Sequence, residues 1–149
     1  MAEAVTETVR SMLLPINGGK ILLPNTVVAE VIGFSEPVQV EQPLDFLLGT
    51  ISWRSVTVPL VSLEKAFGME VPQQNPRAQI AILYTLSGNA SMPYVAVHMQ
   101  GIPHAVVVDE SKLVESESSL NSEFLQAEFL LNNETTLLPN LAAIESAFA

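Results

Sequence analysis

The two histidines of the chain are the first candidates for chemistry. His98 and His104 lie on either side of a Gly-Ile-Pro turn, and neither has a carboxylate beside it in the sequence. Metal sites in proteins usually need three or four ligands in cooperating positions. We therefore interpret both histidines as structural or surface residues, and we expect no metal site.

The other polar motifs do not form a catalytic set. Gly18-Gly19-Lys20 lacks the upstream glycine and the following Ser or Thr of a phosphate loop. The serines between residues 111 and 122 lie among acids without a nearby histidine that could act as a base. The two aspartates, Asp45 and Asp109, are far apart, and no carboxylate pair sits in an apolar strand. We predict no catalytic residues and no cofactor, and therefore a non-catalytic binding or scaffold protein.

The charge balance restricts the class of partner. Sixteen acidic residues against six basic ones give a net charge of −10. A surface of that sign repels phosphate backbones and anionic lipid, so we expect no nucleic acid partner.

The chain has no cysteine, which excludes disulfides and thiolate sites and fits a reducing cytoplasm.

The sequence gives no sign of membrane insertion. Residues 1–10, MAEAVTETVR, carry acids and lack the apolar segment of a signal peptide or anchor. No stretch reaches the roughly 18 uninterrupted apolar residues that a spanning helix needs. We expect a flexible N-terminus over residues 1–10 and no direct contact with the membrane interior.

An acidic region follows later in the chain. Residues 109–134 contain seven acids and a single base, Lys112. The region can be a solvated face that keeps an apolar protein soluble, or an acidic docking surface. The sequence leaves both interpretations open.

Short β-rich segments separated by Pro, Gly and Asn dominate the chain. Residues 12–16 and 20–23 flank Asn17-Gly18, a pair that tolerates positive φ and predicts a tight hairpin. Many short strands at regular spacing, with no visible βαβ unit, favour small antiparallel barrels over a parallel sheet. The expected fold class is mainly β.

Two short helices interrupt the strands. The segment SLEKAFG predicts one helix, with Ser62 as its N-cap and Gly68 as its stop. A second helix is expected over residues 140–148, where Asn140 can cap and the apolar residues fall at i, i+3 and i+7. That apolar stripe is typical of a helix packed on a core.

The two halves of the chain share an order of elements. QIAILYTL, the turn SGN and YVAVHM repeat the strand, turn and strand of the first half. We predict a single domain over residues 11–149 with two similar β lobes, the second spanning roughly 77–138.

One stretch carries a family resemblance. FLLGTISWRSVTVPLVSLEKAFG, residues 46–68, resembles the signature of CheW-like domains. In that signature a Gly, a short Asn-Leu-Arg-Gly-type turn, an aliphatic strand broken by Pro and a helix ending in Phe-Gly follow in order. VVAEVIGF, residues 27–34, is similar to the family's strand that ends in Glu, an aliphatic residue and a Gly-aromatic pair. PYVAVHMQGIPHAV and LLPNLAAIESAF resemble the second-lobe strand pair and the closing strand and helix, so the resemblance runs from about residue 11 to the end.

The resemblance implies a fold and a role. The fold would be two intertwined five-stranded SH3-like β-barrel lobes with short helices around a shared core. The role would be an adaptor that couples the cytoplasmic tip of a methyl-accepting chemoreceptor to a CheA-type histidine kinase, in the cytoplasm at receptor arrays beneath the inner membrane. Arg54 would be the cation that faces the receptor, because a guanidinium can hold a carboxylate bidentately. The expected partner-binding residues are Val28, Glu30, Gly49, Trp53 and Arg54.

The chain departs from the family pattern at the turn itself. Ser52, Trp53 and Ser55 stand where the pattern has Asn, Leu and Gly, and Gln100 stands where it usually has an acid. Divergent single-domain members of this kind often belong to the chemosensory systems of type IV pili and twitching motility. Two alternatives stay open: a small β-barrel that binds a metabolite between its lobes, and an accessory subunit of a larger complex.

Overall fold

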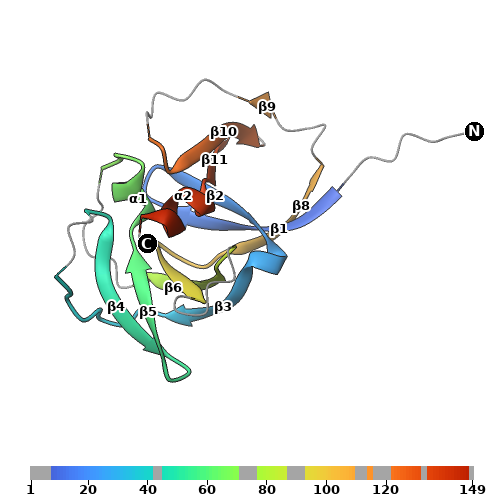
Figure 1. Cartoon of the computed structure of the whole chain (residues 1–149). Coiled ribbons are helices and arrows are strands. Elements are labelled where there is room, and N and C mark those ends of the chain that lie inside the picture. The colour runs from blue at the N-terminus through green and yellow to red at the C-terminus, as the bar shows by residue number, and fades with distance from the viewer. Residues whose placement is uncertain are drawn as a thin grey trace, which may run out of the picture.

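Two β-sheets and two short helices make up the structure. The computed structural model describes residues 8–41, 45–70, 77–86, 93–109, 114–115, 122–131 and 134–147. In spatial order, the strands of the first sheet are β8 (His104–Asp109), β1 (Thr8–Ile16), β2 (Gly19–Pro24), β11 (Glu134–Pro139), β10 (Leu125–Leu131) and β9 (Val114–Glu115). Those of the second are β3 (Val28–Gly33), β6 (Gln79–Tyr84), β7 (Tyr94–Met99), β5 (Val56–Val61) and β4 (Leu47–Trp53). Figure 1 shows the two sheets side by side, with the helices between them.

The predicted mainly β class of two intertwined lobes is confirmed. Each sheet has five longer strands, and the first adds the two-residue β9. The predicted hairpin is present, because Ile16 pairs with Gly19 around Asn17 and Gly18, and Gly18 has a φ of 93°. β1 begins at Thr8, three residues before the predicted start of the domain. Residues 1–7 of the expected flexible N-terminus lie outside the described residues.

The expected lobe boundary near residue 77 is wrong. β6 and β7 come after that residue, yet they pair with β3 and β5 in the second sheet. The cause is two parallel pairings, β5 with β7 and β11 with β2, that join strands distant in the sequence. A boundary drawn along the chain assumes that neighbouring strands pair, and these crossovers break that assumption.

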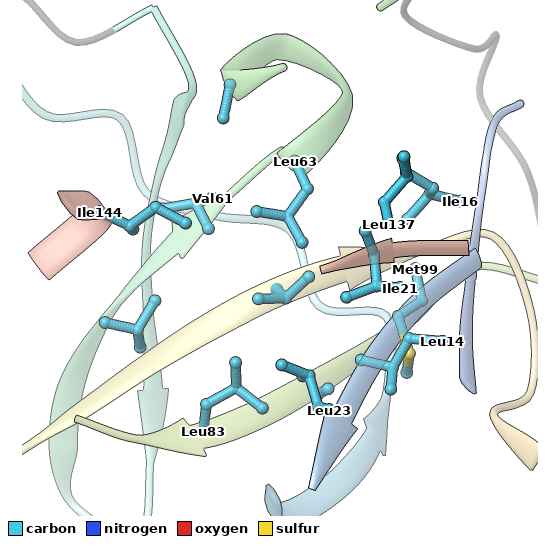
Figure 2. Close-up of a cluster of buried hydrophobic side chains, with 14 of the residues drawn as sticks. Leu14, Ile16, Ile21, Leu23, Val61, Leu63, Leu83, Met99, Leu137 and Ile144 are labelled. Carbon is cyan, nitrogen blue, oxygen red and sulfur yellow. The ribbon is translucent and has the colours of Figure 1, made fainter. Parts of the chain in front are cut away.

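The central strands β6 and β7 of the second sheet are buried on both faces. On β6, Ile80 and Ile82 face one apolar cluster, while Ala81 and Leu83 face another. Because successive side chains of a strand point to opposite faces, one strand can serve both clusters. The larger cluster also receives residues from the first sheet and both helices, as Figure 2 shows for Leu14, Leu23, Leu63, Leu137 and Ile144. This shared core holds the two lobes together.

Both helices begin at the predicted caps. α1 spans Leu63–Ala66, and the Ser62 hydroxyl accepts the Lys65 N–H at 3.3 Å. α2 spans Leu141–Ser146, and Asn140 Oδ1 accepts the Ala143 N–H at 3.1 Å. A 3₁₀ turn, η1 (Asn25–Val27), joins β2 to β3. Phe148, the last residue of the predicted apolar stripe, lies outside the described residues.

A buried carboxylate connects the two lobes. Glu64 in α1 is fully buried and accepts three hydrogen bonds from uncharged donors. The donors are the Asn17 N–H at 3.1 Å, Gln100 Nε2 at 3.1 Å and the Ser62 hydroxyl at 3.4 Å. Asn17 belongs to the β1–β2 hairpin of the first sheet, while α1 follows β5 of the second. Glu64 therefore ties the first sheet to the helix that closes the second.

Candidate functional site

The turn between β4 and β5 presents Arg54. Trp53 pairs with Val56, so Arg54 and Ser55 alone form the loop of the hairpin. Arg54 has a φ of 48° and Ser55 a φ of 65°. Two central residues with positive φ make a type I′ turn, whose twist matches the flanking strands and which usually contains Asn or Gly. Ser at the family's Gly position thus keeps the turn geometry, at a cost in backbone strain.

Ser55→Gly should stabilise the protein by about 1 kcal/mol, because a left-handed backbone strains residues with a Cβ and does not strain glycine. The free energy of unfolding in urea measures the change. Ser52→Gly is the matched control, since Ser52 is an exposed residue of β4 and glycine weakens a strand. Equal destabilisation by both substitutions would contradict the strained turn.

Glu30 joins the edges of the second sheet at this turn. β3 and β4 are the two edge strands of the sheet order, so they are not hydrogen-bonded neighbours. Trp53 Nε1 nevertheless donates to Glu30 Oε2 at 2.5 Å, and Arg54 Nη2 lies 3.3 Å from Glu30 Oε1. The sheet must therefore curl until its first and last strands meet. Three of the five predicted site residues come together here, and we call them the Glu30–Trp53–Arg54 cluster.

Trp53 is a buried platform under an exposed cation. The residue as a whole is 7% exposed, while the side chain of Arg54 is 68% exposed. The Arg54 guanidinium carbon lies 4.7 Å from the centre of the Trp53 ring system, within the range of a cation–π contact. Tyr94 packs edge-on against Trp53 at 4.8 Å, and Tyr84 stands 5.6 Å beyond Tyr94. Sequence reasoning did not single out these tyrosines, although both stand at strand ends where aromatic residues pack well.

Val28 and Gly49 do not join the cluster in the described part of the chain. Val28 packs against the shared core and pairs with Leu83. Gly49 has a φ of 144°, and a Cβ there would collide with the Val38 carbonyl oxygen. That carbonyl accepts the Thr50 N–H at 2.9 Å, so the segment around Val38 runs directly against β4. The glycine is therefore required by the fold, and its partner-binding role stays a prediction.

Neither histidine is part of the Glu30–Trp53–Arg54 cluster, and both lie more than forty residues from it in the sequence. His98 packs edge-on against Phe34 at 5.5 Å, and its Nδ1 lies 3.4 Å from Gln100 Nε2. Desolvation lowers the pKa of His98, and the nearby Glu64 carboxylate partly opposes that shift. The lowered pKa of His98 favours its neutral imidazole form beside Gln100. Across the ranges that the structure describes, no three His, Asp or Glu side chains gather as metal ligands.

Gln100 departs from the family pattern for a physical reason. Its Nε2 donates to the buried Glu64 carboxylate at 3.1 Å. The acid that the pattern usually places here would bring a second negative charge to the same pocket, where the low dielectric makes repulsion costly. A neutral donor satisfies Glu64 instead.

Exposed apolar side chains lie in several stretches of the described surface. Large ones occur in the segment after β3, at the end of β6, around β8 and on β10: Phe34, Val38, Val40, Tyr84, Leu86, Ile102, Val107 and Leu130. A groove between the lobes for a receptor helix stays a prediction.

Much of the acidic region 109–134 lies outside the described residues, namely 110–113, 116–121 and 132–133. No helix in the described ranges is long and apolar enough to cross a bilayer.

Comparison with known proteins gives one family and one fold. A profile of the CheW-like domain matches residues 10–148. Among solved structures, the chain is similar to the scaffolding protein TtCheW from Thermoanaerobacter tengcongensis, with a TM-score of 0.75 and 15% sequence identity. The alignment covers 91% of this chain and 90% of that one. No curated protein sequence matches the chain significantly.

Proposed function

Because the chain belongs to the CheW-like domain family, we propose that it is a non-catalytic adaptor in bacterial chemosensory signal transduction. It couples the cytoplasmic tip of a methyl-accepting chemoreceptor to a CheA-type histidine kinase. The observation that carries this proposal is the family match over residues 10–148, which spans nearly the whole chain. The similar structure is itself described as a scaffolding protein.

The Glu30–Trp53–Arg54 cluster suits a protein contact better than catalysis. It offers an exposed cation above a buried tryptophan, the pair of residue types most enriched at the energetic centres of interfaces. The chain as a whole is strongly acidic, with a net charge of −10 and only six basic residues, so Arg54 is an uncommon positive point on its surface. A receptor surface that carries a carboxylate would recognise it.

The adaptor works in the cytoplasm at receptor arrays beneath the inner membrane. Its two partners are proteins of those arrays, and its acidic surface disfavours nucleic acid and anionic lipid. Ser52, Trp53 and Ser55 depart from the family turn, which supports an output other than flagellar swimming. Twitching by type IV pili is the output that we propose.

A pull-down with purified fragments tests the adaptor. The tagged protein is mixed with a receptor cytoplasmic fragment and the regulatory domain of a CheA-type kinase from the same organism. We expect each fragment to be retained alone and both to be retained together, because an adaptor needs two surfaces. Retention of neither fragment would overturn the proposal.

Deletion of the gene tests the motility output. It should reduce twitching and leave swimming unchanged, whereas the reverse result would assign the protein to flagellar chemotaxis.

A further inference from the structure

Trp53 contacts Arg54 in two ways. Its ring lies under the guanidinium, 4.7 Å from the guanidinium carbon. Its indole N–H also donates to Oε2 of Glu30, the carboxylate whose other oxygen, Oε1, lies 3.3 Å from Arg54 Nη2. Trp53 and Arg54 thus each use one oxygen of the same carboxylate.

This division limits how tightly Glu30 can hold Arg54. A guanidinium and a carboxylate favour a bidentate pair with two parallel hydrogen bonds. Trp53 donates to Oε2 and thereby fixes the orientation of the carboxylate, and in that orientation Arg54 hydrogen-bonds to Oε1 alone. The guanidinium has five N–H donors, and Glu30 is its only polar partner among the described residues. Several donors therefore stay free on a side chain that is 68% exposed.

The platform itself is fixed. Trp53 is 7% exposed and belongs to the smaller apolar cluster together with Ile51 and Leu60. Tyr94 meets its ring edge-on at 4.8 Å, with an angle of 72° between the ring planes. A cation held on a fixed ring loses less side-chain freedom on binding than a mobile arginine.

We propose that Trp53 is a positioning residue for partner recognition. By holding Oε2, it fixes the Glu30 carboxylate in an orientation that gives Arg54 a single hydrogen bond instead of a bidentate pair, and it presents the free edge of the guanidinium to a carboxylate of the partner protein. A leucine, the residue of the family pattern, would leave Oε2 open and let Arg54 close onto Glu30. This inference rests on the proposed function, because it takes the receptor fragment as the partner that supplies the carboxylate.

A double-mutant cycle tests the inference. The affinity of the receptor fragment is measured by calorimetry for the wild type, Trp53→Phe, Arg54→Ala and the double variant. Trp53→Phe keeps an aromatic ring and removes the N–H, so we expect affinity to fall by about five- to tenfold, a coupling typical of residues in contact. In the Arg54→Ala background the same change should have no further effect. An equal loss in both backgrounds would mean that Trp53 has only a structural role, and would overturn the proposal.

A second variant avoids any packing defect. Trp53 is the only tryptophan of the chain, so growth on β-(3-benzothienyl)alanine replaces this side chain alone with one of similar shape and no N–H. We expect the same loss of affinity with unchanged thermal unfolding. Binding equal to that of the wild type would overturn the positioning role and leave the adaptor function intact. Failure of the wild type itself to bind the receptor fragment would instead overturn the proposed function.

Discussion

Arg54→Glu should weaken binding of the receptor fragment by about 100-fold, because reversal of one partner of a close charge pair costs several kcal/mol. The substitution removes the exposed cation of the Glu30–Trp53–Arg54 cluster. It also places a second carboxylate beside Glu30, so a carboxylate of the partner would face two like charges. Calorimetry at 0.15 M salt measures the change, since lower salt would exaggerate surface electrostatics.

The matched control is Arg10→Glu, which makes the same change of charge at an exposed residue of β1 in the other sheet. It should leave receptor affinity nearly unchanged. Arg54→Lys should give an intermediate loss, because an ammonium keeps the charge and cannot bind a carboxylate bidentately. Stability should change little, since the pair that Arg54 forms with Glu30 is largely exposed.

The kinase fragment provides an internal check on the same variant. The family resemblance assigns Arg54 to the receptor, so Arg54→Glu should still retain the kinase fragment. Equal binding of the receptor by wild type and variant would show that Arg54 has been given the wrong role. Loss of both partners from a folded variant would place Arg54 in a surface that both of them need.

The local parts of the fold followed from the sequence, and its pairing did not. Asn17-Gly18, Ser62 and Asn140 were recognised as a turn and two helix caps, because each is determined by a few neighbouring residues. The strand order depends on parallel pairings between distant segments, for which no short pattern exists. Ile80 to Leu83 are also apolar without alternation, so their pattern did not say which core each face would meet.

The candidate site was predictable in part. Trp53 and Arg54 are adjacent in the sequence, and the family resemblance added Glu30 from a strand more than twenty residues away. That Glu30 shares its carboxylate between them depends on the curling of the sheet, which no spacing in the sequence expresses. Tyr94 was missed for the same reason, since it reaches Trp53 from a strand that does not pair with β4.

Glu64 is the residue whose importance sequence reasoning did not find. It occupies an ordinary position in the first turn of α1, where an acid is common because it suits the helix dipole. In the structure it is fully buried and accepts hydrogen bonds from Asn17, Ser62 and Gln100. Its acceptor role depends on the β1–β2 turn and the residue after β7, which the sequence separates by more than eighty positions.

Glu64→Ala should lower the free energy of unfolding by about 3 kcal/mol, because buried donors that lose their acceptor each cost roughly 1–3 kcal/mol. The Asn17 N–H and Gln100 Nε2 would both lose the carboxylate, and the space it filled would be empty or wet. Urea unfolding followed by the fluorescence of Trp53 measures the loss. Since Glu64 connects the lobes, the slope of the unfolding transition also tests whether they still unfold together.

Two controls separate the buried network from a general sensitivity of this region to the loss of a carboxylate. Glu70→Ala removes an exposed acid just after α1 and should change stability by less than about 0.5 kcal/mol, as is usual for surface positions. Glu64→Gln should fall between the wild type and Glu64→Ala, because its amide oxygen can accept from one donor while its NH₂ group faces the other. A loss no larger for Glu64→Ala than for Glu70→Ala would mean that the shared apolar core alone holds the lobes together. A loss near 3 kcal/mol for Glu64→Ala would instead show that this one carboxylate contributes to the connection between the lobes in addition to the shared apolar core.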